Sequence, residues 1–175
     1  MHPDLQKCRD LLGPVLGLPA GFADVAVPGK WSVASILEHL DLTYTMNGAA
    51  VRRRAAKAPG APRSRSFQQW LAQTIVITAG YFPNGRKSPE MVLPRGRPYA
   101  EVAPGMDAHL TGLDRQMQEA ARILGERARV LDHPRLGPLS IDDWRRFHVV
   151  HTRHHVRQIE ERARQAGVRI DATRP

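Results

Sequence analysis

The chain has 175 residues, of which 42% are hydrophobic and 25% charged, and a formal net charge of +9. At roughly 150 residues per domain, this length predicts one domain, residues 1–175, with a substantial buried core. The composition excludes wholesale disorder. The single cysteine, Cys8, excludes a disulfide framework and a zinc site built on paired cysteines. Any bound metal would therefore need histidine or carboxylate ligands.

The positive charge comes mostly from arginine, with 22 Arg against 4 Lys. Apart from the run 52–54 the arginines are scattered, whereas nucleic-acid-binding elements usually cluster their basic residues. The pattern favours a solvated basic surface, with an anionic small molecule or a nucleic acid as the alternative partner. No stretch approaches the ~20 apolar residues of a membrane span, and the first residues lack a signal-peptide pattern. We therefore expect a cytoplasmic protein that does not enter a membrane.

Prolines, glycines and capping residues divide the chain into five predicted helices with no convincing strand. The first helix covers about residues 3–17, and a Gly- and Pro-rich loop follows. Ser32 is a good N-cap for a second helix that runs to about residue 57. After a basic connector over residues 58–65, a third helix runs from Ser66 to about Tyr81, although its β-branched run 74–78 could also form a strand.

The second half of the chain predicts a long loop and two more helices. Residues 82–105 contain five prolines and three glycines, and this loop could cap one end of the fold or act as a crossover. A helix is expected over about residues 106–131, then a turn at 132–139. Ser140 caps the last helix, which ends near residue 165. Four long helices predict an all-α four-helix bundle, with the first helix or a loop region packed alongside.

The last helix carries four of the eight histidines, and two of them lie at the middle of its buried face. At about 100° per residue, His151 and His155 fall within about 20° of Trp144 on the helical wheel. An imidazole at such a position must be hydrogen-bonded, bind a metal or face a cavity. The i, i+4 spacing places both rings on one side of the helix, where they could converge on one ion.

A catalytic metal site commonly has three protein ligands and one open position. His39 is our third candidate, because it flanks the apolar face of the second helix and lies early in it. The alternative is that all three are core histidines with satisfied hydrogen bonds. The pair also lacks the Glu of a His-Glu-x-x-His metalloprotease motif. Glu38 and Asp41 are candidate general bases by sequence proximity alone, and we expect both to face solvent.

Three stretches resemble the DinB/YfiT-like superfamily. Residues 31–40, WSVASILEHL, look like its second-helix motif of a Trp, a capped helix start and His-Leu. The stretch from His133 through Trp144 to HTRHHVRQI at 151–159 resembles the C-terminal signature of one branch. Residues 82–89, FPNGRKSP, are similar to that branch's Pro/Gly loop. The stretches keep the family's order over most of the chain, which makes their combination fairly specific.

The resemblance implies a four-helix bundle, often a homodimer, that holds Zn or Ni through three histidines with open positions for water. Carried over residue by residue, the ligands are His39, His151 and His155, and His154 is a neighbour. Gln158 would support a ligand or be purely structural. Thr43 and Asn47 would line the same cavity or simply pack. From their loop position, Arg86, Arg95 or Arg97 could bind an acidic low-molecular-weight thiol.

Characterised relatives in that superfamily include thiol-dependent S-transferases and isomerases, and others carry the label of metal-dependent hydrolase. We therefore expect a divalent-metal-binding protein that acts on a small molecule, as a thiol-dependent S-transferase or a hydrolase. The alternative is a metal-binding or stress-related protein without catalysis, because we can assign no acid or base beside the ligands. Nucleic-acid binding rests on charge alone and is the least favoured.

Overall fold

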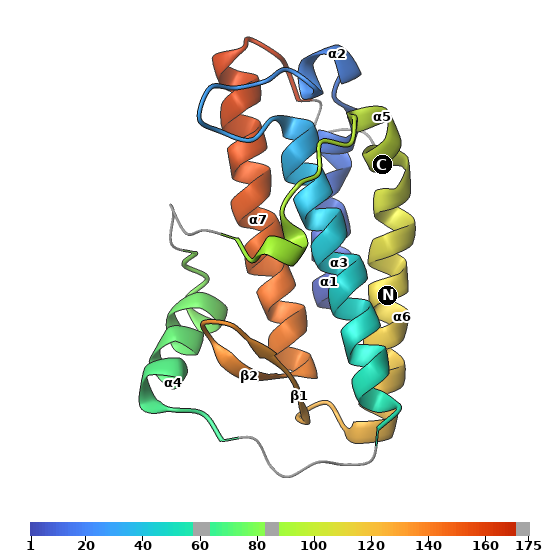
Figure 1. Cartoon of the computed structure of the whole chain (residues 1–175), viewed down its shortest axis with the longest axis vertical. Helices are drawn as coiled ribbons and strands as arrows, with labels where there is room; N and C mark the ends of the chain where they lie inside the picture. Colours follow the sequence, from blue (N-terminus) through green and yellow to red (C-terminus); the bar gives the residue numbers. More distant parts are fainter. Residues whose placement is uncertain (58–63, 83–87, 171–175) are drawn as a thin grey trace.

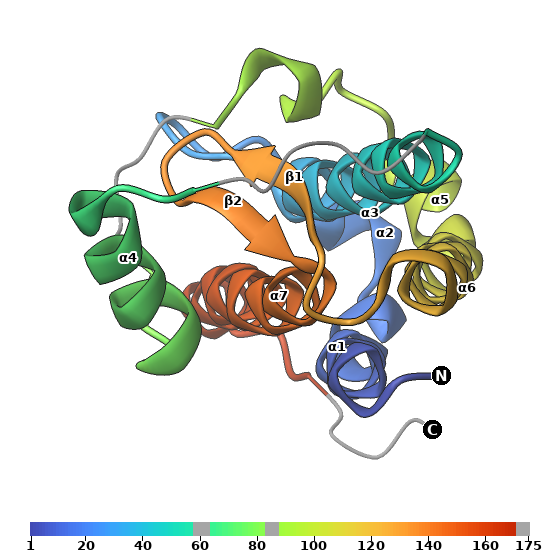
Figure 2. The ribbon, with the colours of Figure 1, turned by 90° about the horizontal axis from the view of Figure 1, so that it is seen from below.

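The body of the protein is four helices that run along one another (Figures 1 and 2). The computed structural model describes residues 1–57, 64–82 and 88–170. The four helices are α1 (Pro3–Leu12), α3 (Val33–Ala55), α6 (Met106–Leu124) and α7 (Ile141–Gln165). Seen end-on, α3 and α7 lie side by side, and α1 and α6 complete the group (Figure 2). The prediction of a mostly α-helical fold is confirmed.

Capping residues define where the helices begin, as the sequence predicts. The Ser32 hydroxyl accepts from the Ser35 amide at 3.1 Å at the start of α3. Ser140 and Asp143 form a reciprocal capping box at the start of α7. Inside, the helices pack their apolar faces into one core, in which Cys8 is fully buried. The largest fully buried apolar side chains are Leu5, Leu12, Ile36, Leu37, Leu40, Tyr44, Met106, Leu110, Leu113, Met117 and Leu139.

A β-hairpin replaces the end of the predicted fourth helix. Strands β1 (Arg129–His133) and β2 (Gly137–Ser140) pair antiparallel. The prediction of a helix to residue 131 and a plain turn at 132–139 is therefore wrong. The reason is Gly125, whose φ of 87° ends α6 seven residues earlier than expected, so that residues 129–133 pair as a strand. The hairpin leads directly into α7 and covers the lower end of that helix (Figure 1).

The predicted third helix is shorter than expected and lies outside the group of four. It consists of α4 (Phe67–Gln73) and a π-helical turn η2 (Thr74–Thr78), so the helical interpretation of 74–78 is confirmed over the strand. It ends before Tyr81 and lies against the hairpin (Figure 2). The shorter α1, followed by the 3-10 helix η1 (Gly13–Gly17), takes its place among the four. The expectation that the first helix packs alongside a bundle containing the third is wrong.

The long connection between α4 and α6 folds back on the start of α3. Its described part holds η3 (Glu90–Val92), α5 (Tyr99–Val102) and η4 (Ala103–Gly105), and a short α2 (Ala20–Ala23) lies in the earlier loop. The Glu38 carboxylate of α3 accepts from the backbone N–H groups of residues 95, 96 and 97 at 2.9, 3.0 and 3.1 Å. In the described part of the chain, no helix has the length and apolarity to cross a membrane.

We predict that Gly137→Ala destabilises the protein by about 2–4 kcal/mol, because it combines backbone strain with a steric clash. Gly137 has a φ of 72°, and an added Cβ would lie 2.4 Å from Cδ of Gln69 on α4. Gly29 has a similar φ of 69° with nothing within 4 Å, so Gly29→Ala isolates the strain. Urea unfolding of both variants measures the difference. Equal losses would show that the approach of Gln69 to the hairpin contributes nothing.

Candidate metal centre

Three buried histidines meet between α3 and α7. His39 comes from the second turn of α3, and His151 and His155 come from adjacent turns of α7. Nε2 of His151 lies 3.2 Å from Nε2 of His39 and 3.1 Å from Nε2 of His155. The ligand atoms of all three lie within 4.8 Å of one another. The structure thus brings together the three residues that the sequence selects, and all three are buried.

The other ring nitrogen of two of these histidines is held by a carbonyl oxygen. Nδ1 of His39 lies 2.7 Å from the carbonyl oxygen of Val92 in η3. Nδ1 of His155 lies 3.0 Å from Oε1 of Gln158, one turn further along α7. A carbonyl oxygen only accepts, so both Nδ1 atoms must carry the proton and both Nε2 atoms keep a lone pair. Contacts of this kind fix the tautomer and the ring orientation of metal-binding histidines.

Burial keeps the three rings neutral. It lowers the pKa of His155 to about 3 and that of His151 well below its usual value, and the neighbouring imidazoles lower both further. Burial also lowers the pKa of His39. At neutral pH the lone pairs of His39 and His155 therefore point at Nε2 of His151, which either carries the His151 proton or joins them as a third ligand of a cation. A divalent cation satisfies this arrangement, because metal ligands must be deprotonated and their lone pairs converge on the ion.

His151 carries a buried atom without a partner. Its Nδ1 has no hydrogen-bond partner among the described residues. With the proton on Nε2, Nδ1 is a buried acceptor without a donor, and with a metal on Nε2, Nδ1–H is a buried donor without an acceptor, so this atom does not distinguish the two arrangements. A metal would use the lone pairs of all three Nε2 atoms, which one shared proton does not. The donor set, three neutral imidazoles, suits Zn²⁺ or Ni²⁺.

Aromatic rings surround the cluster. Trp31, just before α3, lies 5.1 Å from His39 between ring centroids. Phe147 stacks on His151 at 5.3 Å with an interplanar angle of 15°. Phe82 lies 5.4 Å from the His151 ring. These walls hold the imidazoles in place and lower the local dielectric, which strengthens the attraction between a cation and its ligands.

The polar residues expected near the ligands occupy three different places. Gln158 contacts His155 and also lies 3.0 Å from Nε2 of His154, so it links the ligand to its neighbour. Thr43 is buried and donates to the carbonyl oxygen of His39 at 2.8 Å. Asn47 lies 3.3 Å from Nε2 of His148, one turn before the cluster on α7. Among these three, Gln158 contacts the ring of a candidate ligand, His155.

The three loop arginines do not gather at the site in the described part of the chain. Arg86 lies outside the described residues. Arg97 forms ion pairs with Asp41 at 3.4 Å and Glu101 at 3.8 Å. Arg95 has an exposed side chain, three residues beyond the Val92 carbonyl that holds His39. Of these three arginines, Arg95 is therefore the described one whose exposed side chain could contact an anion near the loop.

The expectation that Glu38 and Asp41 face solvent is wrong. Glu38 is fully buried and Asp41 is 3% exposed. Glu38 holds the backbone of residues 95–97, and Asp41 accepts from the imidazole of His109 and the guanidinium of Arg97. Both carboxylates therefore anchor the long loop and α6 to α3. The sequence hides this because the loop that covers them lies more than fifty residues away.

Val92 and Trp31 also support the site, although the sequence does not mark either for this role. Val92 acts through its backbone carbonyl, so its side chain carries no signal. Trp31 belongs to the motif that precedes His39, but only the fold shows that its ring covers that histidine. Arg162 of α7 holds the Trp31 carbonyl oxygen at 2.8 Å, which ties the start of α3 to the end of α7.

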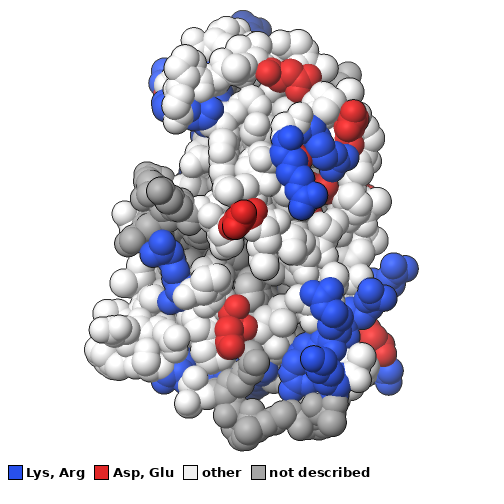
Figure 3. Space-filling view, in the orientation of Figure 1, with Lys and Arg blue, Asp and Glu red and all other residues white. Residues whose placement is uncertain are grey.

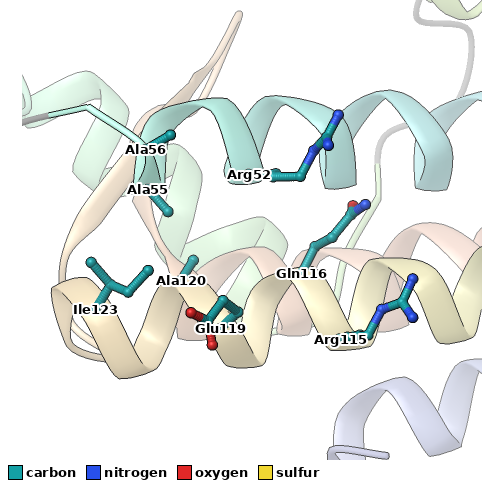
Figure 4. A pocket seen from close by; sticks show the side chains of 8 residues that line it. All are labelled: Arg52, Ala55, Ala56, Arg115, Gln116, Glu119, Ala120 and Ile123. Carbon is teal, nitrogen blue, oxygen red and sulfur yellow. The ribbon is translucent and has the colours of Figure 1, made fainter.

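A separate surface pocket of about 430 Å³ lies between the C-terminal halves of α3 and α6 (Figure 4). No histidine lines it, so it is not part of the metal centre. Basic side chains on the visible face occur in separate places, with the densest group over the lower ends of α3 and α6 (Figure 3). The lining residues are Arg52, Ala55, Ala56, Arg115, Gln116, Glu119, Ala120 and Ile123.

The fold and the cluster define a mostly helical protein with a candidate metal centre between two long helices. The chain belongs to the family described as "Protein of unknown function (DUF1569)", whose model matches residues 20–162. All three histidines lie inside the matched stretch. No curated protein and no solved structure matches the chain.

We predict that the metal-free protein loses stability below the ordinary pKa of histidine. Burial lowers the pKa of His148 to about 3, so the folded chain leaves this ring neutral while the unfolded chain protonates it. The contribution of His148 is complete above about pH 6.5 and is lost progressively as the pH falls toward the folded pKa. Between about pH 7.5 and pH 5 it amounts to about 2 kcal/mol.

Urea unfolding of the chelator-treated protein at both pH values measures this loss, with His148→Gln as the matched variant. The variant has no titratable group at this position, so its free energy of unfolding should fall less than that of the wild type. Parallel pH dependence of the two proteins would contradict the prediction.

Proposed function

We propose that this protein binds one divalent ion, Zn²⁺ or Ni²⁺, through His39, His151 and His155, and that it is a metal-dependent enzyme of the DinB-like type. The observation that carries the proposal is the convergence of the three Nε2 atoms, two of them with their Nδ1 held by carbonyl oxygens. Three neutral ligands from protein leave open positions, which is the pattern of catalytic rather than structural sites.

Metal analysis tests the binding. We expect about one equivalent of Zn²⁺ or Ni²⁺ per chain, and a higher melting temperature in its presence. Alanine at any of the three histidines should weaken binding by at least about 100-fold, because a ligand is lost outright. His154→Ala is the matched control, since this neighbour on the same helix should leave the stoichiometry at one. Retention of metal in the His151→Ala variant would contradict the assignment.

Gln158 gives a finer test of how the site is built. Gln158→Leu removes the acceptor for Nδ1–H of His155 and should weaken metal binding by about 10–100-fold. Gln158→Glu keeps an acceptor oxygen and should bind as tightly as the wild type or more tightly. Both substitutions abolish donation to His154, so their difference isolates the His155 contact. Equal affinities would make Gln158 purely structural.

For the reaction, we propose thiol-dependent S-transfer to a small molecule. A divalent ion with open positions stabilises a bound thiolate or lowers the pKa of bound water toward ~7. The chain's own contribution is to orient three imidazoles and to exclude bulk water with Trp31, Phe82 and Phe147. The exposed Arg95 would meet an acidic group of the thiol. Asp41 and one oxygen of Glu38 are engaged in other contacts, which favours thiolate chemistry over hydrolysis by a carboxylate base.

An assay of the metal-loaded protein with bacillithiol, mycothiol and glutathione tests the reaction. We expect conjugation to an electrophilic acceptor with one of these thiols, and its loss in the His151→Ala variant. Arg95→Ala should raise the apparent KM for the thiol several-fold with little change in kcat. Metal binding without turnover of any thiol would favour the non-catalytic alternative, and hydrolysis without a thiol would favour a hydrolase.

A further inference from the structure

Helix α4 presents its polar side to the protein and its apolar side to solvent. Gln73 is 4% exposed, and its Nε2 donates to the carbonyl oxygens of Leu136 and Pro138 at 2.7 and 3.2 Å. Gln69 lies so close to Gly137 that a Cβ there would clash with it. The glutamines thus fasten α4 to the tip of the β-hairpin. This orientation reverses the ordinary arrangement of a surface helix, which buries its apolar stripe.

The outward side carries a continuous apolar stripe. Phe67 is 73% exposed, Trp70 42%, Leu71 45% and Ile75 40%. Their spacing places them on one face of α4 and the following π-helical turn, and the rings of Phe67 and Trp70 lie 5.6 Å apart. The four side chains expose roughly 400 Å² of apolar surface, which is the size at which a patch on a soluble protein is often functional. We call these four residues the α4 stripe.

The α4 stripe lies in a part of the chain that carries no charge. Residues 66–82 contain no Asp, Glu, Lys, Arg or His, in a protein with 25% charged residues and a net charge of +9. Two copies of such a basic protein repel each other over most of their surfaces. Arg65 lies at the edge of this segment and donates to Gln73 of α4, but the segment itself lets two copies approach with few like charges brought together. This property favours a second copy of the chain as the occupant of the stripe.

We propose that the α4 stripe is the core of a symmetric homodimer interface, in which α4 of one copy packs across α4 of the other. A twofold interface needs only one self-complementary patch, whereas head-to-tail association needs two different ones. In the described ranges, the other exposed large apolar side chains lie on other segments: Met1, Val25, Tyr81, Met91, Leu93 and Ile123. They form no second helical stripe that could receive the first.

The area agrees with this assignment. A standard interface buries about 800 Å² per partner, with an apolar core and a polar rim. The stripe supplies about half of this area as the core, and the neighbouring polar residues of α4 and the hairpin supply the rim. Leu71 lies midway between Phe67 and Ile75, so it is the residue closest to the twofold axis. The dimer therefore places Leu71 of one copy near Leu71 of the other.

Sedimentation equilibrium at tens of micromolar protein tests the proposal. We expect the wild type at twice the monomer mass of 19.5 kDa. Leu71→Glu should raise the dimer dissociation constant by at least about 100-fold, because two carboxylates meet at the axis. Ile123→Glu is the matched control: this residue is 49% exposed on α6, outside the stripe, and its variant should remain dimeric. Circular dichroism checks that each variant is folded.

A mixture of variants makes the test specific for a twofold axis. Leu71→Glu and Leu71→Lys should each be monomeric alone and should form a mixed dimer when combined. A monomeric wild type, or a dimer that Leu71→Glu leaves intact, would overturn the proposal. Binding of the monomeric wild type to phosphatidylcholine vesicles, lost in Leu71→Glu, would assign the stripe to a membrane surface instead. None of these outcomes depends on metal binding.

Discussion

The structure depends on the approach of α3 to α7, which brings the Nε2 atoms of His39 and His151 to 3.2 Å. Two buried imidazoles at this separation are not a stable apolar contact. Burial lowers their pKa values and removes the water that would otherwise satisfy them, so the rings depend on one another or, under the proposed function, on a bound cation. Two contacts support the approach of α3 to α7 at the cluster. Arg162 binds the carbonyl oxygen of Trp31, and the carbonyl oxygen of Val92 fixes the orientation of the His39 ring.

The long connection between α4 and α6 contributes to the same site through backbone groups. Glu38 holds residues 95–97 by three N–H groups, and the carbonyl of Val92 just before them holds His39. Glu38 directly precedes His39 in the sequence. Its buried carboxylate therefore positions the loop segment whose Val92 carbonyl orients the His39 ring. The β-hairpin has a parallel role at the other end of α7, where it holds α4 by two glutamines and leaves the apolar side of that helix exposed.

The sequence predicted the convergence of the three histidines better than it predicted the packing around them. The i, i+4 spacing of His151 and His155 on a long amphipathic helix is a local property. The N-cap at Ser32 is also local, and it defines where α3 begins and therefore on which face of α3 His39 lies. The hairpin was missed because Gly125 ends α6 through a positive φ, which the apolar period of the helix does not reveal. Glu38 was assigned to solvent because its partners are backbone groups of a distant loop, and no residue type marks them.

X-ray absorption spectroscopy of the metal-loaded protein tests the central claim most directly. A centre built from His39, His151 and His155 predicts three imidazole nitrogens at about 2.0–2.1 Å from the ion, with the remaining positions filled by light atoms and no sulfur. The His155→Ala variant, loaded under excess metal, should show a smaller imidazole contribution. A spectrum with one imidazole or none in the wild type would contradict the account.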